Sequence, residues 1–198
     1  QLVGVFVLYA LLQLCYNLGL KYVVLVDVVT VALGFVLRSI AGAYAIDIKL
    51  SIWLLLCVFF LCLYLGFVKR LCDLSSAGRD NTSDWKSRAG YDSSLELNLL
   101  LGLSFVLSIV MYVTYALSNH AEEIFGARAI GFALLTPIVL VVMHRFYRTA
   151  SLGRSDSPLA AIVTDRIIQF GTLLFGAGVL TCLYVPGVEE ILGGLLVN

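Results

Sequence analysis

Charged residues are scarce in this 198-residue sequence: Asp, Glu, Lys and Arg make up 13% of it, while apolar residues make up 61%. Soluble globular domains carry about 25% charged and roughly 45–50% apolar residues. A soluble core of this size has no room for so much apolar surface, and the mean hydropathy of +0.99 agrees with that conclusion. The composition therefore predicts an integral protein of the lipid bilayer.

Several familiar functional motifs are also missing. The five cysteines form no CxxC pair and no Cys/His cluster, so neither a zinc site nor a disulfide framework is indicated. The sequence contains no GxSxG, no Walker A motif, no HExxH and no DxxDGxxAR of the CDP-alcohol transferases. It has no basic–aromatic stripe, and we expect no nucleic-acid partner.

Long apolar runs, by contrast, are abundant. Six of them are long enough to cross about 30 Å of hydrocarbon as helices at about 1.5 Å per residue. They cover residues 2–20, 22–46, 51–68, 94–117, 124–147 and 163–185. Two connecting loops, at about 69–93 and 144–162, are long and rich in charge, Gly and Ser. We predict an all-α polytopic transmembrane bundle that forms a single membrane-embedded domain over 1–198.

Positive charge is unevenly divided between the two sides that alternating spans create. Two cations, Lys49 and Arg128, fall on one side. The other side collects ten: Lys21, Lys69, Arg70, Arg79, Lys86, Arg88, Arg145, Arg148, Arg154 and Arg166. Because Lys and Arg accumulate on the cytoplasmic side of membrane proteins, we place the two long loops in the cytoplasm.

The second span carries two charges inside the apolar run, where charge is costly and usually functional. Asp27 and Arg38 are eleven residues apart, so they share a helix face about 16 Å apart along the axis. That distance is too long for a direct pair. The spacing is compatible with two side chains that line one polar cavity, or with ion pairs to other helices.

The third span ends in GFVKRLCD, residues 66–73. If its helix continues, Lys69 and Arg70 share a face with Asp73 at i, i+4 and i, i+3 spacing. Cations that hold phosphate oxygens would then stand beside a carboxylate that can hold Mg²⁺. A Lys-Arg pair at a membrane exit is also typical of simple anchoring. Tyr64, about one turn earlier, is a candidate to point its hydroxyl into the same cavity.

The last span begins with a second acid–base pair at the same interface, Asp165-Arg166. The pair is interpreted either as part of a polar site or as a local surface salt bridge.

Three strings carry a resemblance to a known family. They are YNLGLKYVVLVDVVTVALGFVLRSIAGAYA (16–45), FVKRLCDL (67–74) and SPLAAIVTDRIIQ (157–169). In this order they resemble the UbiA superfamily of membrane prenyltransferases, and within it the decaprenyl-phosphate phosphoribosyltransferase branch. The likeness covers most of residues 9–185.

The resemblance implies a nine-helix bundle, of which the six spans would be the last six, with a cavity open to the cytoplasm. It implies a transferase of a bacterial inner membrane that moves a 5-phosphoribosyl group from phosphoribosyl pyrophosphate to a polyprenyl (decaprenyl) phosphate. Pyrophosphate would be released, Mg²⁺ would be required, and the product would serve cell-wall biosynthesis.

The resemblance also implies roles for matched residues. Asp73 and Lys69 would be catalytic, with Asp73 as a metal ligand or an orienter of the cations. Substrate-binding roles would fall to Lys21, Arg70, Arg38, Asp27, Tyr64, Asp165 and Arg166.

The sequence departs from the family pattern in three ways. The first Asp-rich motif, NDxxDxxxD, is absent; since the chain opens without Met inside an apolar run, we expect the motif upstream of residue 1 and an incomplete, inactive enzyme without it. Asp73 replaces the branch's usual Glu. Leu159-Ala160 stand where relatives often carry acidic residues.

Two other functions fit the composition. A UbiA-type enzyme that prenylates an aromatic acceptor is one, although such enzymes usually carry a second DxxxD motif near the KR position. A small transporter is the other, with Asp27 and Arg38 along its pathway, although most of the charge lies in the loops.

Overall fold

The computed structural model describes residues 2–80, 94–153, 157–185 and 187, and in this part of the chain it contains helices and no strands. The helices are α1 (Leu2–Leu18), the 3-10 turn η1 (Leu20–Tyr22), α2 (Val26–Ala45), α3 (Ile52–Asp80), α5 (Ser94–Ala116), α6 (Asn119–Phe125), α7 (Arg128–Leu134), α8 (Thr136–Ser151), α9 (Pro158–Thr164) and α10 (Arg166–Tyr184). The predicted all-α class is confirmed.

Five helical segments are long and apolar enough to cross a membrane. They are Val26–Ala45, Ile52–Ser75, Leu95–Ala116, Arg128–Ser151 and Arg166–Tyr184, so α7 and α8 together make one span. The first predicted span forms α1, an apolar helix of 17 residues that falls just short of these five in length. The chain is therefore an integral membrane protein with a polytopic helical bundle.

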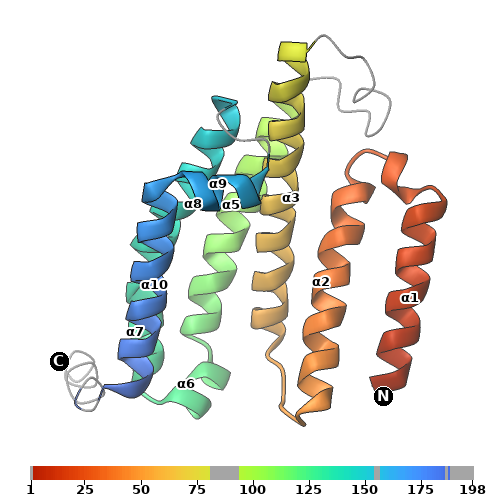
Figure 1. Ribbon diagram of the computed structural model, residues 1–198. Helices are drawn as coiled ribbons and strands as arrows, with labels where there is room; N and C mark the ends of the chain where they lie inside the picture. The colour runs from red at the N-terminus through yellow and green to blue at the C-terminus, as the bar shows by residue number, and fades with distance from the viewer. Residues whose placement is uncertain (1, 81–93, 154–156, 186, 188–198) are drawn as a thin grey trace.

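The bundle has two distinct ends (Figure 1). Helices α1, α2 and α3 stand side by side, and α5, α8 and α10 continue the bundle from α3. The turn between α1 and α2, the C-terminal part of α3 and the short helix α9 all lie at one end, and α6 lies at the other. We call the first the α9 end. It is the end to which the alternating spans assign most of the positive charge.

Both predicted loops differ from the structure at their edges. Helix α3 continues through residues 69–80, and α8 continues to Ser151, so the two helices extend beyond their apolar segments. The sequence after Phe67 contains no helix breaker up to Gly78, and Arg70 pairs with Asp73 one turn later, which supports the continuation. The second loop also contains α9, whose first turn is capped by Ser157. Residues 81–93, the rest of the first loop, lie outside the described part.

Helix α3 is the centre of the core. Its buried side chains include Tyr64, Phe67, Val68, Leu71 and Cys72, which pack against buried residues of α2, α5 and α8. Four of these five, from Phe67 onward, lie in the half of α3 near the α9 end, so the polar residues interspersed among them are held on a well-packed helix.

Candidate functional site

The central feature of the α9 end is a chain of three charged side chains that joins α2 to α3. Arg70 donates from Nε to Oδ2 of Asp27 at 2.8 Å, and one of its terminal nitrogens lies 2.8 Å from the same oxygen. Its other terminal nitrogen donates to Oδ2 of Asp73 at 3.2 Å. The Asp27 side chain is 0% exposed, that of Arg70 24% and that of Asp73 36%. The cluster therefore runs from the protein interior to an accessible carboxylate.

A close helix contact brings the two sides of this cluster together. Gly66 lies one turn before Arg70, and a Cβ added to it would sit 2.4 Å from Cγ1 of Val28, the residue after Asp27. Real Cβ atoms do not approach a neighbour so closely, so α2 and α3 pack at this distance only because residue 66 is glycine. Glycine at a helix contact in a membrane allows such close packing.

Two further predicted cations lie near the cluster in the sequence. Lys69 precedes Arg70, and its side chain is exposed. Lys21 lies in η1, on the turn that leads into α2, and its ammonium stacks 5.1 Å from the ring centre of Tyr22. Lys69, Arg70 and Asp73 thus share one helix end, as predicted from the spacing, and Lys21 belongs to the same end of the bundle.

A second cluster joins α8 to the start of α10. Arg145 donates from Nε to Oδ2 of Asp165 at 2.8 Å, and the Thr149 hydroxyl lies 3.4 Å from the same oxygen. The other oxygen, Oδ1, accepts the backbone N–H groups of Ile167 and Ile168 at 2.9 and 3.3 Å, so Asp165 caps α10. Both oxygens are occupied within the protein. Arg166, the other half of the predicted pair, has an exposed side chain.

The environment of Asp165 changes its acidity. Partial burial, which leaves the side chain 11% exposed, tends to raise the pKa of this carboxyl group. The hydrogen bond from Arg145 and the two helix N–H groups outweigh that effect, so the pKa of Asp165 lies below its ordinary value.

This shift predicts how stability depends on pH. Because the folded pKa is lowered, the stabilisation by Asp165 is complete above the unfolded pKa of about 3.9, and it is lost as pH falls through the lower folded value. We expect the difference in thermal midpoint between the wild type and Asp165→Asn, measured in detergent, to be constant above about pH 5 and to shrink below it. Asparagine still caps the helix, so the variant isolates the charge. A difference that persists unchanged under strong acid would contradict this assignment.

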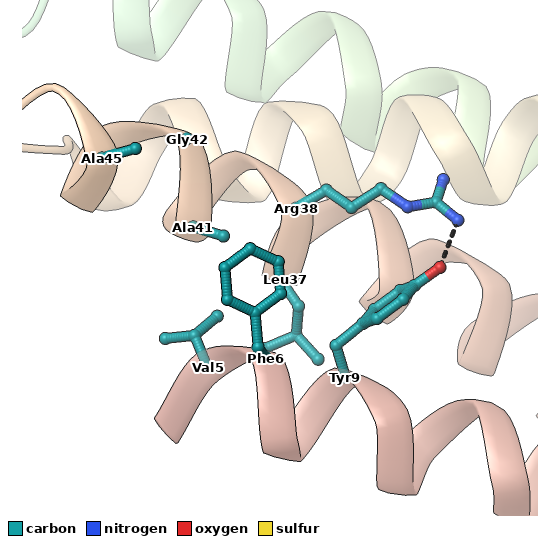
Figure 2. Close-up of a pocket in the computed structure, with 8 residues that line it drawn as sticks. All are labelled: Val5, Phe6, Tyr9, Leu37, Arg38, Ala41, Gly42 and Ala45. Atoms are coloured by element: carbon teal, nitrogen blue, oxygen red, sulfur yellow. Dashed lines mark hydrogen bonds between the residues drawn. The ribbon is translucent and has the colours of Figure 1, made fainter. Parts of the chain in front are cut away.

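Arg38 lies apart from both clusters. Its guanidinium donates to the Tyr9 hydroxyl on α1 at 2.5 Å (Figure 2). It also stacks on the rings of Tyr9 and Phe35. Toward the far end of α1 and α2 it borders an apolar groove of about 390 Å³. Asp27 and Arg38 share one helix, as predicted, but Asp27 pairs with Arg70 on α3 and Arg38 with α1. The structure shows an ion pair to another helix at Asp27, whereas Arg38 donates to Tyr9 on α1.

Tyr64 also has a partner of its own. Its side chain is fully buried against α5 and α8, and its hydroxyl donates to the backbone carbonyl of Met143. The hydroxyl therefore ties α3 to α8.

The described residues offer a limited set of metal ligands. No group of three His, Cys, Asp or Glu side chains gathers in this part of the chain. Mg²⁺ commonly takes one or two carboxylates and completes its shell with substrate phosphates and water. Asp73, the accessible carboxylate of the cluster, fits such a substrate-bridged ion, whereas Asp27 is enclosed and Asp165 is occupied on both oxygens.

Sequence reasoning did not assign three residues that shape these clusters. Arg145 was noted as a cation of the α9 end, but its pairing with Asp165 spans 20 residues and depends on how α8 packs on α10. Thr149 follows Arg145 by one turn, a spacing that could have suggested a shared face. Gly66 carries no charge, and only the distance to Val28 reveals its role.

Comparisons with known proteins find curated relatives, whereas no family model matches the chain. A protein of Mycolicibacterium smegmatis is 31% identical over 169 residues, which cover 83% of this chain and 53% of the relative. One of Mycobacterium tuberculosis is 29% identical over 176 residues, 88% of this chain and 56% of the relative. One of Corynebacterium glutamicum is 25% identical over 179 residues, with coverages of 89% and 52%.

All three relatives carry the name decaprenyl-phosphate phosphoribosyltransferase. The alignments cover most of this chain and support the resemblance to that UbiA-type branch. They do not favour the aromatic-acceptor enzyme or the transporter. The chain spans about half the length of the curated relatives it matches.

Proposed function

We propose, from the similarity to the decaprenyl-phosphate phosphoribosyltransferases, that the chain takes part in the same kind of transfer. A 5-phosphoribosyl group would pass from phosphoribosyl pyrophosphate to a polyprenyl phosphate at the α9 end of the bundle. We place that end in the cytoplasm because most cations gather there. We place the protein in a bacterial inner membrane because the relatives it resembles are bacterial proteins. The product would serve the assembly of the cell wall.

The observation that carries the proposal is the exposed edge of the three-residue cluster. Lys69, which is exposed, and Asp73, which is partly exposed, lie one helical turn apart, directly beside Arg70 and its buried partner Asp27. An ammonium group can hold phosphate oxygens, and a carboxylate can hold the cation that accompanies a pyrophosphate. A substrate with several phosphates needs both kinds of group at one place.

The chemistry requires an acceptor, a donor and a leaving group. An oxygen of the lipid phosphate attacks the anomeric carbon of ribose, while the bond from that carbon to pyrophosphate breaks and the bonding electrons leave with pyrophosphate. Lys69 and Lys21 would bind and orient the phosphates and offset the charge that develops on the leaving group. Asp73 would hold Mg²⁺ against the pyrophosphate, and the ion, when bound, supplies charge neutralisation of the leaving group.

A direct assay tests this proposal. The full-length protein, in detergent or native membranes, is mixed with a polyprenyl phosphate and with phosphoribosyl pyrophosphate labelled in its ribose. We expect labelled lipid to accumulate with Mg²⁺ present. No labelled lipid should form when EDTA is present from the start of the reaction. A folded, membrane-inserted protein that transfers no label with Mg²⁺ would refute the proposal. Label that persists in EDTA would refute the role of the metal alone.

A further inference from the structure

We propose that Asp27 and Arg70 are positioning residues, which fix Lys69 and Asp73 in place and do not themselves bind substrate. We call the pair the Asp27–Arg70 clasp. Its part in catalysis rests on the proposed function, whereas its geometry is a property of the fold.

The donors of Arg70 are committed inside the protein. All three nitrogens of its guanidinium lie within 3.2 Å of a carboxylate oxygen, two beside Asp27 and one beside Asp73. A phosphate that bound Arg70 in a fork-like manner would have to displace at least one carboxylate. Because Asp27 is fully buried, displacing it would leave a carboxylate enclosed without its cation, which is strongly unfavourable. The charge of Arg70 is thus largely used to hold Asp27.

The clasp lies next to the exposed residues Lys69 and Asp73 and can therefore set their positions. Lys69 is the neighbour of Arg70 and Asp73 follows one turn later, so any rotation or shift of α3 moves all three together. The contact of Gly66 with Val28 holds the same two helices one turn away from the clasp. Two independent contacts, one apolar and one ionic, therefore set the position of this part of α3 against α2.

The clasp also holds the helix that follows Lys21. Leu25, just before α2 and two residues from Asp27, has a φ of 67°, which is uncommon for a bulky side chain. Such a conformation persists where the surroundings fix the chain on both sides. The ion pair at Asp27 provides that fixation, so the turn that carries Lys21 is tied to α3.

Kinetics of Asp27→Asn separate positioning from direct binding. If the clasp positions Lys69 and Asp73, asparagine at residue 27 keeps the size of the side chain but weakens the link between α2 and α3. We then expect kcat to fall by about 10²-fold while KM for phosphoribosyl pyrophosphate changes little. Gly66→Ala, which alters no charged group, gives the same pattern. Gly102→Ala on α5, where an added Cβ meets no atom within 4 Å, leaves both constants unchanged.

Two other outcomes would contradict either the clasp or the proposed function. If Arg70 binds phosphate itself, Asp27→Asn frees the guanidinium, so kcat is kept and KM stays or falls; that outcome overturns the proposal. A wild type that transfers no label refutes the proposed function instead, and the clasp is then judged by stability.

The stability test needs no activity. Thermal midpoints in detergent are measured for Asp27→Asn, Gly66→Ala and the double variant. We expect Asp27→Asn to lower the midpoint less when Gly66→Ala has already separated the helices, because the two contacts act on one interface. In the Gly102→Ala background the effect of Asp27→Asn is undiminished. If the decreases in thermal midpoint caused by Asp27→Asn and Gly66→Ala are additive, the two contacts act independently, and that result would overturn the clasp.

Discussion

Asp73→Asn is expected to lower the rate of phosphoribosyl transfer by about 10²–10³-fold while the protein still folds and inserts. Asparagine can still accept the hydrogen bond from Arg70, so the local structure is kept and the charge alone is lost. Asp73 is the accessible carboxylate of the cluster and the residue best placed to hold a cation against pyrophosphate. The measurement is the rate at which labelled ribose enters the lipid fraction.

A matched control lies at the opposite end of the bundle. Asp47 follows α2 and has a φ of 53°, a backbone conformation that asparagine adopts readily, so Asp47→Asn makes the same chemical change without strain. It should leave the transfer rate unchanged. Lys69→Ala should lower transfer as Asp73→Asn does, mainly by raising KM. Full transfer in both Lys69→Ala and Asp73→Asn would mean that the exposed edge of the cluster is not the site.

Arg70→Ala is expected to produce the largest loss of stability. It removes the cation that faces a fully buried carboxylate, and breaking a buried ion pair from one side costs about 3–5 kcal/mol. We expect the lower part of that range, since 24% of the Arg70 side chain is open to its surroundings. Arg148→Ala is the control: Arg148 is also at the α9 end, is exposed and forms no ion pair with the described residues, so its effect should stay within about 0.5 kcal/mol.

A double variant distinguishes stability from function. Replacing a whole buried ion pair with apolar residues of similar size is often neutral or stabilising. Asp27→Leu combined with Arg70→Met should therefore recover most of the stability that Arg70→Ala loses. Transfer should stay low, because the clasp no longer sets the position of Lys69 and Asp73. A double variant that is as unstable as Arg70→Ala would show that the loss of stability comes from packing around residue 70 and not from the unpaired charge of Asp27.

Much of the local arrangement was predictable from sequence. The apolar runs gave the helices, since only helices satisfy the backbone polar groups of such segments inside a bilayer. The i, i+3 spacing correctly predicted that Arg70 and Asp73 share a helix face, because helical geometry alone brings those positions together. The start of α10 at Arg166 follows from an aspartate at the N-cap position.

The partner of Asp27 was not predictable in the same way. The sequence placed Asp27 and Arg38 on one helix face, yet Asp27 pairs with Arg70, 43 residues away, and Arg38 pairs with Tyr9, 29 residues away. Pairing between helices depends on which faces meet and how closely they approach. No pattern within one helix carries that information.

The sequence by itself determined that this chain is a helical membrane protein, which end collects the positive charge, and which residues of α3 lie together. Composition, charge distribution and helical periodicity act locally, so they can be read without a structure. Tertiary structure alone decided which charges are enclosed and which are open. Gly66 permits the close approach of α2 to α3 at Val28. Next to this contact Asp27 is enclosed with Arg70, whereas Asp73 and Lys69 are accessible at the α9 end. That division between enclosed and accessible charge arises because the cost of burying a carboxylate is met only where packing supplies its cation.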